Sequence, residues 1–436
     1  MTAETCPREI VEPDFPINAV LAGEEEAIRC PFPAFAHLRD GHPVVWSDKL
    51  NAWLVSTYAD IREVLKDPIL FSSQYASGRG SVTGLAEKIA DDDSFPAETR
   101  RQAARRVQLA KSNVLLTADP PLHKRQRGLV AMAFTPRRVK EMEPEFQVIV
   151  DGLVDNLPDK GTVDIMRDFA MPLPMTVIAR ILGVPQEMMP TFKNWTIAFT
   201  KGVGSLDLTR DEVIDLFANV NEFYDYFSDQ LAKRRTEPRD DLLTDLLEAR
   251  MGGEEPLTED EILQMLVQFL VAGNETTTNL IGSTVKRLIE DDDLMASVRA
   301  DLDLVPAIIE ETLRLESPAQ GLFRTATADA EVGGQQVKEG DMVFLMYSSG
   351  NRDDDAFEAA GEVRLDGSRA HHLAFGRGEH VCLGANLARR EAAIAVTTLL
   401  VRVDDLAHAS AEEPSRYMKS FALRGLLSLP VSFSKR

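Results

Sequence analysis

The sequence predicts a mainly α-helical protein of the α+β class, with a small β-rich region. Apolar residues at helical spacing recur almost without a break from residue 121 to residue 315. Between residues 319 and 347 the spacing changes to alternation, which is typical of strands. Since no repeat or interdomain linker divides the chain, we expect one large domain over residues 1–436, with 1–32 as an N-terminal extension.

The composition is that of an acidic globular protein. The formal net charge of −22 disfavours binding to nucleic acids and to anionic membrane surfaces. No apolar run reaches the roughly 18–20 residues of a membrane span, and the first residues lack the apolar stretch of a signal peptide. Cys6, Cys30 and Cys382 are too few and too scattered for a disulfide framework. We therefore expect a cytoplasmic protein in a reducing compartment, with no nucleic-acid or membrane partner.

The first part of the chain predicts loops, two helices and two strands. After an N-terminal loop, a helix is expected over Pro33–Asp40, followed by strands over His42–Ser47 and Ala52–Thr57. A second helix is expected over Tyr58–Lys66. Residues 72–113 are polar and weakly periodic, which predicts a mobile connection with short helices.

The remaining elements follow from the same spacing rules. Strands are expected over 319–330, 331–337 and 341–347, with Gly333-Gly334 and Glu339-Gly340 as turns, and a terminal hairpin over 416–434 around Gly425. The remaining helices are expected over 121–134, 137–156, 164–183, 186–202, 209–235, 239–252, 259–291, 293–315 and 383–401.

Cys382 stands between a glycine-rich turn and the predicted last helix. A helix N-terminus stabilises a thiolate, and Gly376 and Gly378 allow backbone conformations that other residues avoid. A lone thiolate cannot build a zinc or iron–sulfur site, but it can be the axial ligand of a haem iron. Two alternatives remain open: a small buried hydrophobe, or half of a dinucleotide fingerprint in which Val381 replaces the third glycine.

The predicted helix over 259–291 contains the second unusual segment. Thr258 and Glu261 form a capping box at its start. Its first half is apolar, yet the polar run Gly273–Thr278 lies at its centre, where unpaired polar groups are costly. One interpretation is that the threonines donate back to carbonyl groups one turn earlier. The other is a local opening of the helix, in which Gly273 admits a ligand and a hydroxyl–carboxylate pair delivers protons.

Together these segments resemble the cytochrome P450 superfamily. Residues 375–384 read Phe-Gly-x-Gly-x-His-x-Cys-x-Gly, the pattern of its haem-binding loop, and 272–277 match Ala-Gly-x-Glu/Asp-Thr-Thr. The resemblance implies that haem b lies between the long helix and the loop and helix over 369–401, with the Cys382 thiolate as the iron ligand. It further implies that Thr276 holds the hydrogen bonds around dioxygen and that Glu275 relays protons.

Other matches extend the resemblance from Pro33 to Val431. Glu311 and Arg314 form the Glu-x-x-Arg pair that is buried in the family. The usual basic third partner is replaced by Glu362, so we expect Arg364 or Arg369 to take its place. Near Asn351-Arg352-Asp353, Asp354 replaces a common proline.

The resemblance also implies a set of haem contacts. The run from Asp119 to Arg127 matches Asp-Pro-Pro-x-His-x-x-x-Arg, so His123 and Arg127 would hold a propionate, together with Arg324 and His380. Phe375 would shield the thiolate. The predicted cofactor-binding residues are His123, Arg127, Ala272, Gly273, Thr276, Thr277, Arg324, Ala374, Phe375, Gly376, His380, Cys382, Leu383 and Gly384.

Family position suggests a mostly apolar substrate pocket with two glutamines that could orient a polar group. Residues 72–113 and 191–206, with Phe192, Trp195 and Phe199, would form a substrate-access lid. The predicted substrate-binding residues are Gln268, Val271, Ala272, Gln320, Leu322, Phe323, Ala422 and Leu423.

A basic patch in this acidic chain predicts an electron donor. No acid occurs between Pro120 and Lys140, and no flavin or iron–sulfur domain is fused to the chain. A ferredoxin or flavodoxin would therefore dock here, and NAD(P)H would act only through that partner. The basic residues are Lys124, Arg125, Arg127, Arg137, Arg138 and Lys140, together with Arg377, Arg389 and Arg390 around the cysteine.

The resemblance thus predicts a haem-thiolate monooxygenase of the soluble bacterial type, a monomer that hydroxylates a hydrophobic small molecule with dioxygen. Two alternatives are a peroxygenase or isomerase with the same cofactor, and a non-catalytic ligand sensor. An intact Glu275-Thr276 pair disfavours the first, because those enzymes need no protonation of dioxygen. The absence of an appended signalling domain from the sequence disfavours the second.

Overall fold

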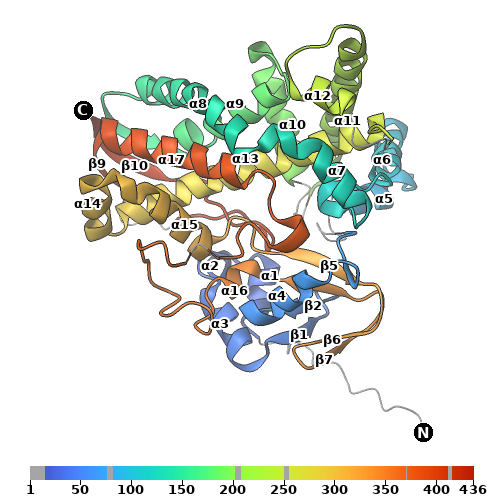
Figure 1. The fold of residues 1–436 in the computed structure, drawn as a ribbon, viewed down its shortest axis with the longest axis horizontal. Helices are drawn as coiled ribbons and strands as arrows, with labels where there is room; N and C mark the ends of the chain where they lie inside the picture. The colour runs from blue at the N-terminus through green and yellow to red at the C-terminus, as the bar shows by residue number, and fades with distance from the viewer. Residues whose placement is uncertain (1–14, 76–81, 202–207, 250–254, 370, 411–414) are drawn as a thin grey trace.

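The computed structural model describes residues 15–75, 82–201, 208–249, 255–369, 371–410 and 415–436. It confirms a mainly helical fold with small β-sheets. Figure 1 shows a broad helical layer and, beneath it, a smaller part that combines a sheet with the N-terminal helices. The proposed single-domain division stays a prediction. In the described ranges, no helix has the length and hydrophobicity needed to cross a bilayer.

The helical layer is built around α13, which spans Glu259–Ile289 (Figure 1). Thr258 accepts a hydrogen bond from the Glu261 amide and Glu261 bonds back to Thr258, as the capping box predicts. Neighbours on several sides bury the helix. It packs against α9 (Pro172–Ile181), α15 (Val305–Glu316) and α17 (Ala385–Arg402), among others.

The other helices of the layer agree in type with most predictions, and several of them are shorter than expected. They are α5 (Val82–Ala90), α6 (Ala97–Ala110), α7 (Leu122–Val130), α8 (Pro136–Asn156), α10 (Met189–Lys201), α11 (Arg210–Thr236), α12 (Leu242–Glu248) and α14 (Asp292–Ala300). The helix expected over 293–315 is divided into α14 and α15. Asp301 ends α14, and its carboxylate caps the short turn Leu302–Leu304 that leads into α15.

The smaller part contains a five-stranded sheet in the order β1-β2-β8-β5-β3. Its strands are β1 (Val44–Ser47), β2 (Ala52–Val55), β8 (Met342–Leu345), β5 (Leu322–Ala326) and β3 (Phe71–Ser72). β2 and β8 pair in parallel, which joins the N-terminal strands to the strands near residue 340. β6 (Ala330–Val332) and β7 (Gln335–Val337) form the hairpin predicted at Gly333-Gly334.

Helices α3 (Phe32–Gly41), α4 (Tyr58–Lys66) and α16 (Tyr347–Gly350) accompany this sheet. The N-terminal loop prediction is wrong for the described residues, because α1 (Ile17–Ala22) and α2 (Glu25–Arg29) lie there. Ile17, Val20 and Leu21 are buried against α3. The helices are only one or two turns long, so apolar spacing gives a weak signal.

The C-terminal prediction is partly wrong. Instead of a hairpin over 416–434, β10 (Pro430–Lys435) pairs with β4 (Lys160–Asp164) and β9 (Val403–His408). Only an isolated bridge joins Tyr417 to Leu426. β4 was not predicted; it overlaps the helix expected over 164–183 only at Asp164, and the helical stretch Met166–Ala170 and α9 follow it. The first three residues of β4 are exposed, so the sequence shows no buried alternation there.

A buried guanidinium joins α15 to the chain that precedes the cysteine loop. Arg314 is fully buried and donates to both carboxylate oxygens of Glu311, at 2.8 and 2.9 Å. It also donates to the carbonyl oxygens of Asn351, Ala360 and Glu362. Burial would raise the pKa of Glu311, but hydrogen bonds from Arg314 and from the Arg364 amide hold it below its usual range.

The expected replacement for the missing basic partner is confirmed in part. Arg369 is buried and its Nη1 lies 3.4 Å from Glu311 Oε2. Arg364 contributes only its backbone amide, while its side chain pairs with the exposed Glu358. The backbone carbonyl of Glu362 accepts hydrogen bonds from Arg314 and Arg369, so an acidic side chain is tolerated at that position.

Replacement of Arg314 by leucine should lower the free energy of unfolding by about 3–5 kcal/mol, because Glu311 would lose its main partner while remaining buried. Urea titration of the purified protein measures this change. Arg364→Ala is the matched control, since its exposed ion pair with Glu358 contributes little. An Arg314→Leu protein as stable as the wild type would contradict this role.

Candidate functional site

The loop before α17 has the tight geometry that its glycines predict. Gly376 and Gly378 have φ angles of 66° and 72°, in the left-handed region that favours glycine. The Cys382 amide donates to the Phe375 carbonyl at 2.8 Å, which closes the loop on itself. The helix begins at Ala385, slightly later than predicted, and Gly384 is its N-cap residue.

Cys382 lies in a densely packed part of the protein, yet its surface is accessible. Burial raises the pKa of its thiol, while the Gly384 amide and the charges of Arg127 and Arg389 act in the opposite direction. Ala272 is also accessible, although it lies at the centre of buried α13. Accessible positions on the two elements predicted to enclose the haem fit a flat group held between them.

Four basic side chains gather near the cysteine, as the propionate prediction requires. The His123 and His380 rings lie 4.0 Å apart between centroids. Burial lowers the pKa of His380 to about 3, with further lowering from His123, Arg324 and Arg127. His380 contacts Ser73 Oγ at 2.9 Å. Ser73 is a contact that the sequence analysis missed, because Ser73 and His380 are far apart in the chain.

The two arginines of this group have no carboxylate partner in the described part of the chain. Arg324 Nη1 donates to the Phe323 carbonyl at 2.7 Å, and burial lowers the pKa of Arg127. Buried cations without counter-ions are costly. Two haem propionates would supply the missing negative charges, so this donor set fits the predicted cofactor.

The polar centre of α13 differs from the predicted opening. The helix is continuous from Glu259 to Ile289, and Thr276 Oγ1 donates to the Ala272 carbonyl at 2.6 Å. The back-bonding interpretation is therefore the one that this structure supports. Glu275 is largely enclosed, and burial raises the pKa of its carboxyl group, with a partial opposite effect from Asn279.

Arg389 reaches from α17 to the residues behind the cysteine. Its guanidinium lies 4.5 Å from the Phe375 ring centroid, within cation–π range, and it donates to both oxygens of Glu310 at 2.6 and 2.8 Å. His372 Nε2 contacts the same carboxylate at 3.1 Å. The sequence analysis placed Arg389 only in a basic patch, and its spacing gave no sign of Glu310, which lies far away in the chain.

The two glutamines predicted to orient a substrate are engaged by the protein itself. Gln268 donates to the Val114 carbonyl at 2.8 Å and accepts from the Leu116 amide at 3.1 Å. Gln320 is buried and donates to the Phe421 carbonyl. Their role in this structure is to position neighbouring loops.

The remaining substrate candidates lie in different environments. Phe323 is buried in the core around β5, which disfavours direct contact with a ligand. Ala272 is accessible. Partial exposure is found at Val271, Leu322, Ala422 and Leu423.

The role of 72–113 and 191–206 as a substrate-access lid stays a prediction. The short helices expected within 72–113 are present as α5 and α6, which pack against each other. Phe192, Trp195 and Phe199 on α10 are buried, and Trp195 and Phe199 contact aromatic rings of α11. These side chains belong to the core. Residues 76–81 and 202–206 of the predicted lid lie outside the described residues.

Acids pair with five of the nine residues of the predicted basic patch, and four of these acids come from other segments. Ion pairs join Arg125 to Glu261, Arg137 to Glu141, Arg138 to Asp240, Arg389 to Glu310 and Arg390 to Glu143. Lys124, Lys140 and Arg377 are exposed and have no ion-pair partner in the described ranges. The net basic surface is therefore smaller than the sequence predicts.

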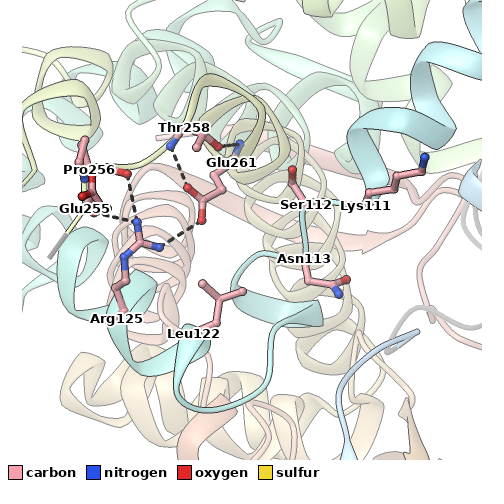
Figure 2. Close-up of a pocket in the computed structure, with 9 residues that line it drawn as sticks. All are labelled: Lys111, Ser112, Asn113, Leu122, Arg125, Glu255, Pro256, Thr258 and Glu261. Atoms are coloured by element: carbon pink, nitrogen blue, oxygen red, sulfur yellow. Dashed lines mark hydrogen bonds and ion pairs between the residues drawn. The ribbon is translucent and has the colours of Figure 1, made fainter.

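Figure 2 shows an open pocket of about 460 Å³ beside the start of α13. Arg125 donates to Glu261 at 3.2 Å and to the carbonyl oxygens of Glu255 and Pro256, at 2.8 and 3.1 Å (Figure 2). Gln126 donates to the same Glu261 carboxylate at 3.0 Å. None of the predicted haem or substrate contacts lines this pocket, and its polar groups tie α7 to the first turn of α13.

Glu310→Gln should weaken the protein in a pH-dependent manner. Burial alone would raise the pKa of Glu310, but hydrogen bonds from Arg389 and His372 lower it to about 2. This stabilisation is complete above the unfolded pKa near 4.5 and is lost as the pH falls toward 2. The variant should lose roughly 2–3 kcal/mol in the free energy of unfolding at pH 7, and the loss should shrink below about pH 5. Urea titrations across this range measure it; a difference that stays constant down to pH 3 would contradict the ion pair.

Comparisons with known proteins agree with this geometry. A family model described as Cytochrome P450 matches residues 206–424. Cytochrome P450 109 of Bacillus spizizenii is 38% identical over 405 residues, which cover 92% of this chain and 91% of the relative. The crystal structure of CYP109E1 from Bacillus megaterium with testosterone has 32% identity and a TM-score of 0.79, covering 93% of this chain and 98% of that one.

The crystal structure of P450BioI with an acyl carrier protein ligated to hexadec-9Z-enoic acid has 31% identity and a TM-score of 0.81. The similarity covers 94% of this chain and 99% of that chain. Both the sequence and the fold are therefore shared over nearly the full length of these relatives. The chain belongs to the cytochrome P450 family of monooxygenases.

Proposed function

We propose that the chain binds haem b through the Cys382 thiolate and hydroxylates a small, largely apolar organic molecule with dioxygen. The observation that carries this proposal is an accessible thiol at the head of α17, with the charges of Arg127 and Arg389 acting on it. The haem would supply the iron centre at which dioxygen is activated, while the protein supplies positioning, shielding and protons.

The surroundings of each residue indicate which of these tasks it would perform. His123, Arg127, Arg324 and His380 would hold the propionates, with both rings neutral and able to donate one hydrogen bond each. Phe375 would cover the thiolate, and Arg389 supports the face of its ring. The fixed loop geometry keeps the thiol in place before the cofactor arrives.

Glu275 and Thr276 would deliver protons to dioxygen. Burial raises the pKa of Glu275, which moves the carboxyl group toward a state that can give up a proton near neutral pH. The Thr276 hydroxyl already donates to the Ala272 carbonyl, so its oxygen is free to accept a hydrogen bond from a water or from dioxygen after protonation. This pair supports oxygen chemistry over the peroxygenase and isomerase alternatives.

The substrate is proposed to be apolar because the polar side chains predicted near it already bind the protein. Both glutamines hold backbone groups, which leaves five apolar candidates that are at least partly accessible: Val271, Ala272, Leu322, Ala422 and Leu423. Two similar structures are complexes with testosterone and with an acyl carrier protein ligated to hexadec-9Z-enoic acid, and both small molecules are largely hydrocarbon. A steroid or fatty acyl chain is therefore the first substrate class to screen, by the change of haem spin state on binding.

Cys382→Ser provides the direct test of the cofactor. The ferrous carbon-monoxide complex of the wild type should show the strongly red-shifted Soret band of thiolate ligation, and the variant should lose it. Total haem should be measured in both proteins, so that loss of the ligand is distinguished from loss of the cofactor. A histidine-like band in the fresh wild type, or failure to take up haem when it is supplied, would contradict the proposal.

A separate ferredoxin or flavodoxin is proposed to supply the electrons. The triple variant Lys124→Glu, Lys140→Glu, Arg377→Glu should raise the KM for an acidic ferredoxin severalfold, and the effect should weaken at high salt. The control is Arg101→Glu, since Arg101 is exposed on α6 and outside the predicted patch. Equal KM values for the triple variant and the wild type at low salt would exclude docking at these residues.

A further inference from the structure

The amide of Asn279 is unusual within α13. The residue is only 1% exposed, yet neither its Nδ2 nor its Oδ1 has a hydrogen-bond partner among the residues that the structure describes. Leaving a buried amide unpaired is costly, so such groups are rare in folded proteins and call for an explanation. Thr278 Oγ1 is also buried without a partner, but a hydroxyl group is smaller and rotates more freely.

Asn279 lies one helical turn after Glu275, so the two side chains emerge on the same face of α13. Burial is the main cause of the raised Glu275 pKa, and Asn279 is the one group that acts against it. No charged side chain in the described part of the chain contributes to this shift. The i,i+4 spacing places the Asn279 amide beside the Glu275 carboxyl group, and a small side-chain rotation would bring the two into hydrogen-bond geometry.

A second segment fixes the place of the amide. A Cβ atom added at Gly425 would lie 2.1 Å from Asn279 Oδ1 and 2.4 Å from Nδ2, so only glycine leaves room for this side chain. The backbone there is anchored by Arg424, which donates to Glu316 at 2.8 Å and to the carbonyl oxygens of Ile28 and Arg29. The terminal turn at Gly425 therefore lies directly against the Asn279 amide.

We propose that Asn279 positions the Glu275 carboxyl group for proton transfer, and that Gly425 sets the place of the Asn279 amide. An amide can donate to a carboxylate and can accept from a carboxylic acid, so one side chain can hold Glu275 before and after it gives up its proton. A hydrocarbon side chain of similar size could support neither state. This inference rests on the proposed function, because it assigns a partner to the proton-carrying residue.

The test compares Asn279→Leu, Asn279→Asp and Gly425→Ala with Thr278→Val as the matched control. Thr278→Val removes a buried, unpartnered hydroxyl next to Asn279 without touching the proposed pair. Two readouts are needed: the pH midpoint of Glu275, from the infrared carboxylic-acid band that Glu275→Gln removes, and the yield of hydroxylated product per electron. Haem content and the ferrous carbon-monoxide spectrum are recorded for every variant.

Asn279→Leu should move the Glu275 midpoint to higher pH, because the group that lowers this pKa is removed. Product per electron should fall about tenfold, with the lost electrons recovered as hydrogen peroxide. Asn279→Asp should also move the midpoint upward, since a second carboxylate repels the first. Gly425→Ala should give a smaller change in the same direction, and Thr278→Val should match the wild type.

Three results would distinguish an error in the positioning role of Asn279 from an error in the proton role of Glu275. If Glu275→Gln lowers the yield per electron but the midpoint and yield of Asn279→Leu match the wild type, the positioning role is wrong. If Asn279→Leu does not fold, unchanged values in both Asn279→Asp and Gly425→Ala overturn the inference. If Glu275→Gln itself leaves the yield unchanged, the proton role in the proposed function is wrong, and the inference falls with it.

Discussion

The structure depends on the burial of α13. A helix of 31 residues surrounded by other helices must satisfy every polar side chain from within the protein, because little water reaches it. Its neighbours supply many of the partners. Gln268 holds the backbone at Val114 and Leu116, while Gln264 meets Tyr224 and Arg106. The polar groups on α13 thereby fix the position of α6, α11 and the turn before α7.

The residues of α13 that are proposed to take part in the reaction are those whose polar groups have few hydrogen-bond partners. Glu275 and Asn279 are enclosed and incompletely paired, whereas Gln264 and Gln268 on the same helix are well bonded. We relate this difference in hydrogen bonding to the proposed proton transfer by Glu275. A fully satisfied carboxyl group would be a poor proton donor, since its proton would be held by fixed partners. An enclosed carboxyl group beside an adaptable amide retains the ability to exchange it.

The local patterns in the sequence predicted the parts of this protein that are set by nearby residues. The capping box at Thr258, the positive φ angles at Gly376 and Gly378, and the grouping of His123 with His380 all follow from short motifs or the family resemblance. Contacts between residues that are far apart in the chain could not be predicted from these local patterns. β10 joins strands near residues 160 and 405, and Arg389 reaches Glu310, because the tertiary fold brings these segments together.

The charge of the folded surface also could not be predicted from local sequence patterns. The run from Pro120 to Lys140 contains only basic charges, but acids outside the run pair with three of its six basic residues in the folded protein. In an acidic chain, the net charge of a sequence segment is therefore a poor guide to the charge of the surface that it forms. Two arginines near Cys382, one buried and one half-buried, are the exception to this pairing. Arg127 and Arg324 keep no carboxylate partner within the described residues even though the chain has 70 acidic residues, and this selectivity is what a dianionic cofactor requires.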